Sequence, residues 1–169
     1  MPAIEADLAH GGHWTLAGEK AEKLALLVFY RGLHCPICRN WVGELQRLLP
    51  EFERRGVSVI ALSCDSRDDA EAACKQWNLR TLRVGYGVEP EDARKAGLYL
   101  SERSETDPAT GAEHTRLFAE PAVMAVQPEG TLYMAWAQSN AFARPHLSEV
   151  LAALDNMLAR GLPEPRGAA

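Results

Sequence analysis

Two cysteines, Cys35 and Cys38, stand where an apolar run gives way to a helix-like pattern. The run 24–31, LALLVFYR, is continuous and rich in strand formers, which is typical of a strand buried in the centre of a sheet. Pro36 then occupies a position that suits the first turn of a helix, and apolar residues recur three to four apart from Trp41 onwards. This junction predicts a core strand followed by a helix of about five turns.

The same alternation continues along the chain. The runs 57–64 and 81–87 are strand-like, and each is followed by a segment with helical spacing, 65–78 and 90–100. Strands that alternate with helices indicate a parallel sheet with crossover helices. Two further apolar runs around the turn QPEG predict an antiparallel hairpin, and a last amphipathic helix ends near Gly161.

The segment 101–120 interrupts this alternation. It is polar, contains Pro108 and Gly111, and shows no convincing period. We expect a long surface loop. It either forms a mobile flap beside the cysteine pair and carries His114 and Arg116 towards it, or is a solvated excursion without a role at the site.

Length and composition predict one globular domain. The chain has 169 residues, of which 47% are apolar and 24% charged, so it can bury one substantial core. We expect a single domain over residues 1–163 and a disordered tail over 164–169. A net charge of −5 without a basic patch argues against nucleic acid as a partner. The acidic N-terminus does not resemble a secretory signal and no apolar run reaches membrane-spanning length, so we expect a cytoplasmic protein with no membrane contact.

The position of the close cysteine pair suits redox chemistry. In a reducing compartment structural disulfides are disfavoured. The amide groups and the dipole at a helix start favour the thiolate of Cys35 and lower its pKa, and its sulfur is expected to lie nearer solvent than that of Cys38. Cys38 lies one turn further on, within reach of an oxidised Cys35. His34 and Arg39 are candidate sources of positive charge nearby.

Other interpretations of the cysteines were weighed. Cys64 ends a strand at the sheet edge where ligands bind, and either packs as a buried thiol or takes part in the site. Cys74 falls on the apolar stripe of its helix, which indicates core packing. A zinc site needs a second ligand pair, whereas these two cysteines are separated by nine residues without a close histidine. A Cu(I) site made by Cys35, Cys38 and a histidine is a third alternative. We expect no metal and no cofactor.

Three stretches of the chain carry a family resemblance. They are FYRGLHCPICRNWVGELQRLLPEF, GVSVIALSCDSRDDAEAACKQWNL and EPAVMAVQPEGTLYMAWAQSNAFARPHLSEVLAAL, over roughly residues 20–158. They resemble the peroxiredoxin-like branch of the alkyl hydroperoxide reductase and thiol-specific antioxidant (AhpC/TSA) family, in the thioredoxin-fold superfamily. The order of elements and the placement of Cys-x-x-Cys also indicate a thioredoxin-like α/β fold, with a central mixed sheet flanked by helices. By this resemblance, Cys35 is the peroxidatic cysteine and Cys38 the resolving one.

The sequence departs from the family pattern at two places. Gly32 stands where the family carries a hydroxyl residue, and Glu120 and Pro121 stand where it carries an arginine. Arg31 and Arg116 are the candidates to replace that arginine. Pro121 also resembles the cis-proline that faces the cysteines of thioredoxins, although an ordinary trans proline at a strand entry is the alternative.

The function expected from these observations is thiol-dependent redox catalysis. The Cys35 thiolate reduces a hydroperoxide, condenses with Cys38 to a disulfide, and is regenerated by an external thiol such as thioredoxin, glutaredoxin or glutathione. The alternative is a thioredoxin-like disulfide reductase that uses the same pair. The sequence is compatible with a homodimer.

Overall fold

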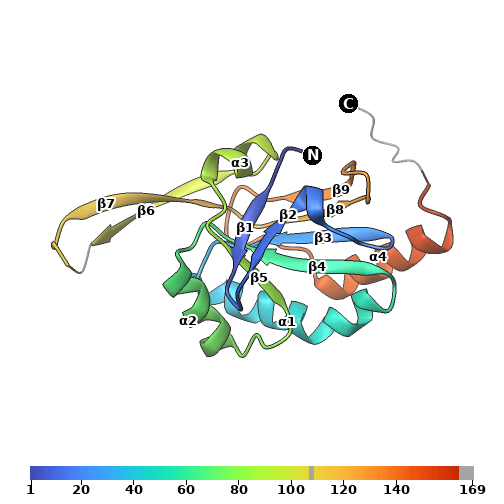
Figure 1. The fold of residues 1–169 in the computed structure, drawn as a ribbon, viewed down its shortest axis with the longest axis horizontal. Helices are drawn as coiled ribbons and strands as arrows, with labels where there is room; N and C mark the ends of the chain where they lie inside the picture. Colours follow the sequence, from blue (N-terminus) through green and yellow to red (C-terminus); the bar gives the residue numbers. More distant parts are fainter. Residues whose placement is uncertain (107–108, 164–169) are drawn as a thin grey trace.

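The computed structural model describes residues 1–106 and 109–163. At its centre lies a seven-stranded sheet with the order β2-β1-β5-β4-β3-β8-β9 (Figure 1). Its strands are β1 (Glu5–Leu8), β2 (His13–Thr15), β3 (Leu24–Phe29), β4 (Val57–Leu62), β5 (Arg83–Tyr86), β8 (Ala122–Val126) and β9 (Leu132–Ala137). β3, β4 and β5 are parallel, and the strands outside them pair antiparallel. The predicted α/β fold with a central mixed sheet is therefore confirmed.

Helices cover both faces of the sheet. They are α1 (Pro36–Glu53), α2 (Arg67–Trp77), α3 (Pro90–Lys95) and α4 (Leu147–Ala159), with a short 3-10 turn η1 (Leu16–Gly18). Figure 1 shows α1, α2 and α4 below the sheet and α3 above it. Two buried clusters result, one between the sheet and the three longer helices and one on the face of α3.

β3 is buried on both faces of the sheet, which explains the continuous apolar run in its sequence. All six of its residues are buried. Because successive side chains of a strand point to opposite faces, Leu26 and Val28 join the cluster below the sheet, while Leu27 and Phe29 join the other. Full burial of such a side chain contributes about 1.5–3 kcal/mol. Packing on both faces therefore holds the strand in place, and its carboxyl end positions the turn that leads to Cys35.

The helix after this strand forms as its sequence predicts. Pro36 lies in the first turn, where its missing N–H costs nothing. The buried residues of α1 are Cys38, Trp41, Val42, Leu45, Leu49 and Phe52. This spacing makes one apolar stripe that packs against the sheet. Cys35 is the N-cap residue, with an extended backbone at φ −98° and ψ 108°.

The prediction of a loop over residues 101–120 is wrong. β6 (Leu100–Thr106) and β7 (Glu113–Ala119) pair antiparallel as a two-stranded sheet, and Figure 1 shows this hairpin reaching away from the molecule at the left. The strands pair with each other and bury apolar side chains only near their base, at Phe118 and Ala119. A strand that buries little has no apolar period to reveal it.

The expectations about membrane contact, location and domain bounds have the following outcomes. No helix in the described ranges is long and apolar enough to cross a membrane. A cytoplasmic location and a single domain over residues 1–163 stay predictions. The expected disordered tail, 164–169, falls outside the described residues.

Candidate active site

The cysteine pair lies at the carboxyl end of β3, where α1 begins. Cys35 caps the helix and Cys38 lies in its first turn, with its backbone N–H donating to the Cys35 carbonyl oxygen at 3.1 Å. Cys35 is 2% exposed and Cys38 is fully buried. Both residues are buried, and Cys35 is the slightly more exposed of the two. The pair is reduced in this structure, as both residues are free thiols.

The two thiols differ sharply in acidity. A hydrogen bond from the Cys38 thiol, together with the Cys38 backbone N–H and the side chains of Arg144 and Arg31, lowers the pKa of Cys35 to about 4, although burial opposes this shift. The same contact with Cys35, followed by burial, raises the pKa of Cys38. At neutral pH, Cys35 is thus a thiolate and Cys38 a protonated thiol. The thiolate is the nucleophilic form of cysteine.

Arg144 is the main residue of the site that the sequence did not indicate. Its Nη2 lies 3.5 Å from the Cys35 sulfur and 3.4 Å from the Cys38 sulfur. The guanidinium carbon lies 5.1 Å from the ring centroid of Trp41, and the Trp41 indole N–H donates to the carbonyl oxygen of Pro145 at 3.1 Å. Trp41 therefore fixes both the cation and the segment that carries it.

Arg31 belongs to the site but is committed to other partners as well. Its Nε lies 3.2 Å from Glu120 Oε2, and its guanidinium carbon lies 4.8 Å from the ring centroid of Phe118. The Glu120 side chain is 3% exposed, and its other oxygen accepts from the Ser101 hydroxyl at 2.6 Å. The buried pair links the turn before Cys35 to the base of the hairpin.

His34 is not the source of positive charge that the sequence suggested. Its ring packs edge to face on Phe118, with centroids 4.9 Å apart. Burial, followed by the charges of Arg103 and Arg31, lowers its pKa to about 4. The imidazole is therefore neutral at neutral pH. Both ring nitrogens are buried, with no hydrogen-bond partner in the described ranges. Arg39 is exposed on α1.

Two predicted site residues are placed differently from expectation. Arg116 points to the start of α2, with Nη1 at 3.0 Å from Asp69 Oδ2 and Nη2 donating to the carbonyl oxygen of Cys64 at 2.8 Å. It also lies 3.6 Å from Glu105. Its interactions tie the hairpin to the molecule rather than to the cysteine pair. The expectation of a cis bond before Pro121 is wrong, because the described residues contain no cis peptide bond.

The remaining cysteines lie in the core. Cys64 is 9% and Cys74 8% exposed, in the two separate clusters. Burial raises the pKa of each thiol to about 11. Both are protonated at neutral pH and are poor nucleophiles, as expected of packed thiols.

The charge next to the pair bears on metal binding. A guanidinium group touches both sulfurs, and a cation in that place repels a second one. Within the described part of the chain, no three His, Cys, Asp or Glu side chains are grouped to hold a metal ion. The arrangement gives no support to the Cu(I) alternative.

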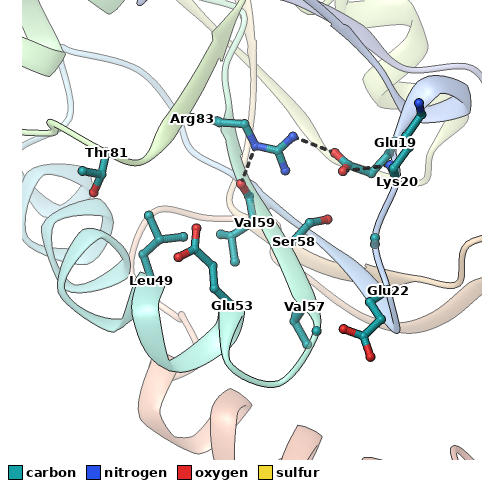
Figure 2. Close-up of a pocket in the computed structure, with 12 residues that line it drawn as sticks. Glu19, Lys20, Glu22, Leu49, Glu53, Val57, Ser58, Val59, Thr81 and Arg83 are labelled. Atoms are coloured by element: carbon teal, nitrogen blue, oxygen red, sulfur yellow. Dashed lines mark hydrogen bonds and ion pairs between the residues drawn. The ribbon is translucent and has the colours of Figure 1, made fainter.

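A hollow of about 360 Å³ lies elsewhere, beside the starts of β4 and β5 and the end of α1. Figure 2 shows Arg83 among the lining residues, where it donates to the Val59 carbonyl oxygen at 3.1 Å and to Glu19 at 2.9 Å. In parallel sheets ligands bind at the carboxyl ends of the strands, which is where Cys35 lies. The hollow therefore lies at the opposite end of the strands from the cysteine pair.

Comparison with known proteins identifies the family. The model of the AhpC/TSA family matches residues 1–135. A probable 1-Cys peroxiredoxin of Syntrichia ruralis is 25% identical over 159 residues, which cover 93% of this chain and 71% of that protein. Peroxiredoxin-6 of Gallus gallus is 30% identical over 125 residues, or 60% of this chain and 54% of that protein.

A solved structure agrees with the fold. A cysteine-to-serine mutant of peroxiredoxin 6 from Arenicola marina superposes with a TM-score of 0.72 at 22% identity, covering 95% of this chain and 72% of that one. This likeness confirms the predicted thioredoxin-like fold. The family model spans the cysteine pair and most of the central sheet. The chain belongs to the AhpC/TSA family.

Proposed function

We propose that this protein is a thiol peroxidase in which Cys35 is the nucleophile. The observation that carries the proposal is the guanidinium group of Arg144, held against a cysteine whose pKa is lowered to about 4. A thiolate at the start of a helix is the form that attacks a peroxide. Family membership and the peroxiredoxin names of the relatives support the same chemistry.

The Cys35 thiolate attacks the terminal oxygen of a hydroperoxide, so a sulfur–oxygen bond forms and the oxygen–oxygen bond breaks. The sulfur is oxidised to a sulfenic acid, and the alkoxide or hydroxide that leaves takes up a proton. Arg144 Nε and Nη1 have no hydrogen-bond partner in the described ranges, and we assign these donors to the peroxide oxygens. Arg31 adds a second cation, while the neutral His34 directly precedes Cys35 in the chain.

We assign the resolving role to Cys38. Its thiol contacts Cys35, and both sulfurs touch the same nitrogen of Arg144. The Cys38 sulfur attacks the sulfenic sulfur, a disulfide forms and water leaves. An external dithiol then reduces the disulfide. Several relatives are named 1-Cys peroxiredoxins; in a one-cysteine cycle, an outside thiol would attack the sulfenic acid directly.

Burial of the pair favours a peroxide over a protein disulfide as the electron acceptor. Both cysteines are at most 2% exposed. A small hydroperoxide needs only a narrow opening beside Arg144, whereas a protein disulfide must bring its own sulfur atom and flanking backbone to Cys35. The disulfide reductase that the sequence left open therefore needs a larger rearrangement of the same residues.

The test is consumption of hydrogen peroxide with dithiothreitol, thioredoxin and glutathione in turn. We expect Cys35→Ser to abolish turnover with every reductant, and Cys74→Ser, which removes another buried thiol, to retain it. Cys38→Ser should retain the first oxidation and lose turnover with thioredoxin, because no disulfide forms for a dithiol to reduce. Equal turnover in Cys35→Ser and the parent protein would disprove the proposal.

A further inference from the structure

A buried carboxylate supports the turn that leads to Cys35. Asp65 follows β4, the strand next to β3, and is 4% exposed. Its Oδ2 accepts a hydrogen bond from the backbone N–H of Leu33 at 3.0 Å. A neighbouring strand thus holds the backbone two residues before the nucleophile. The proposed peroxidase steps leave this contact without a role.

Gly32 shows how closely the carboxylate and the turn approach. Its φ is +127°, and a Cβ atom built on it would lie 2.3 Å from Asp65 Oδ1. A side chain at this position would collide with the carboxylate in addition to straining the backbone. The Gly32 carbonyl oxygen accepts from the Cys35 N–H at 3.1 Å. The carboxylate, the glycine and the nucleophile therefore form one continuous set of contacts.

Asp65 is itself held in place. Its backbone N–H donates to the Ser63 hydroxyl at 3.3 Å, and its carbonyl oxygen accepts from the Gly87 N–H at 3.0 Å. The support thus comes from the ends of two central strands, β4 and β5. Such an anchor can fix the turn with little freedom.

The electrostatic setting makes Asp65 costly for stability. Burial, with the negative charge of Asp69 from α2, raises its pKa to about 6, although the Leu33 N–H, Arg116 from β7 and Ser63 oppose the shift. Tyr30 and Cys64 also face it. A buried, partly compensated carboxylate reduces stability relative to a neutral side chain. A carboxylate at position 65 is therefore better explained by its hydrogen bond to the turn before Cys35 than by a contribution to the stability of the fold.

We propose that Asp65 is a positioning residue for Cys35, its carboxylate oxygen anchoring the Leu33 N–H so that Cys35 stays at the cap of α1. The inference rests on the proposed function, in which Cys35 is the nucleophile. The cap position directs the Cys35 sulfur to the donors of Cys38 and Arg144. What the turn requires from position 65 is a hydrogen-bond acceptor of the right length, and the negative charge is not needed.

Two variants separate the acceptor from the charge. Asp65→Asn keeps an oxygen at the same distance, and Asp65→Ala removes it. In Asp65→Ala we expect the pKa of Cys35, measured by thiolate absorbance against pH, to rise by at least about one unit. Because the sulfur is then misplaced relative to the donors of Arg144, we also expect the reaction with hydrogen peroxide to slow about tenfold. In Asp65→Asn we expect the acid dissociation constant of Cys35 and the rate of its reaction with hydrogen peroxide each to stay within about threefold of the parent protein.

A spectroscopic signal keeps the inference testable if Asp65→Ala does not fold. In the parent protein the Leu33 amide proton resonance should shift with a midpoint near the pKa of Asp65, about 6. In Asp65→Asn that titration should vanish while the amide stays slow to exchange. A Leu33 amide that exchanges freely in Asp65→Asn, or a Cys35 pKa in a folded Asp65→Ala that is unchanged from the parent protein, would overturn the inference.

Asp69→Asn is the matched control. It removes a neighbouring carboxylate that pairs with Arg116 and leaves the turn untouched. We expect an unchanged Cys35 pKa, and an equal rise in this variant and in Asp65→Ala would overturn the anchoring role. The Cys35 pKa is read without peroxide, so it tests the anchor even if peroxide turnover, and with it the proposed function, should fail.

Discussion

The guanidinium group of Arg144 lies 3.5 Å from the sulfur of Cys35, although 109 positions of the chain separate the two residues. Arg144 lies in the loop between β9 and α4, a segment distant in sequence from Asp65 and β4. A cation held on the face of Trp41 and pointed at a buried thiolate has little other function than to stabilise negative charge there. We base the first prediction on this contact.

Replacement of Arg144 should slow the attack on peroxide. We expect Arg144→Ala to raise the pKa of Cys35 and to lower the rate constant for hydrogen peroxide roughly a hundredfold, the scale of losing one preorganised donor. Arg144→Lys should recover part of the rate, because it keeps the charge and loses the planar fork. Stopped-flow kinetics would measure both. Arg39→Ala, at an exposed site of α1, is the control, and an equal loss there would contradict a specific role.

The buried ion pair of Arg31 and Glu120 should matter for stability. Glu120→Gln leaves a mostly buried guanidinium without its counter-charge, so the free energy of unfolding should fall by about 3 kcal/mol. Denaturant titration would measure it. Glu102→Gln, on the exposed side of the same hairpin, should change stability little. A similar small change in both variants would mean that the pair contributes nothing.

Much of this site follows from local sequence patterns, and the rest from contacts between distant segments. The apolar run of β3, Pro36 and the stripe of α1 predicted the position of Cys35 because each signal acts within a few residues. The hairpin was missed because its strands alternate without burying an apolar face. Arg144 and Asp65 gave no local signal, since their partners lie on other elements. Their roles depend on how the segments close in space.

The buried side of the hairpin's base should be needed for stability and activity, and its exposed side should not. Phe118 is buried against His34 and Arg31, whereas its neighbour Leu117 is 39% exposed. We expect Phe118→Ala to lose about 3 kcal/mol of stability and to slow peroxide reduction, because it removes the surface on which both side chains rest. Leu117→Ala should do neither. Thermal unfolding and peroxide kinetics on the two variants would decide, and equal behaviour would refute the distinction.

The thiolate should also show in the pH dependence of stability. The pKa of Cys35 is lowered from 9.0 to about 4, so the folded state releases this proton while the unfolded state holds it. The contribution is lost as the pH falls through the folded value and is complete above the unfolded one. Between about pH 5 and about pH 8, the reduced protein should therefore gain stability relative to Cys35→Ser. A constant difference would show that Cys35 is an ordinary thiol.

The comparison with Cys35→Ser removes this group together with its coupling to Cys38 and His34. The pKa of Asp65 is raised to about 6 in the folded protein, so its contribution to the free energy of unfolding falls as the pH rises above its unfolded-state pKa. Asp65 is present in both proteins, so this contribution cancels. Cys64 and Cys74, with pKa values raised to about 11, do not titrate in this window.

The central claim is that Cys35 takes an oxygen atom from peroxide and passes the oxidation to Cys38. Intact-mass spectrometry after one equivalent of hydrogen peroxide tests it most directly. The parent protein should lose two hydrogen atoms, with the disulfide mapped to Cys35 and Cys38, Cys38→Ser should gain one oxygen atom, and Cys35→Ser should stay unchanged. Oxidation of Cys35→Ser to the same extent as the parent protein would contradict the account.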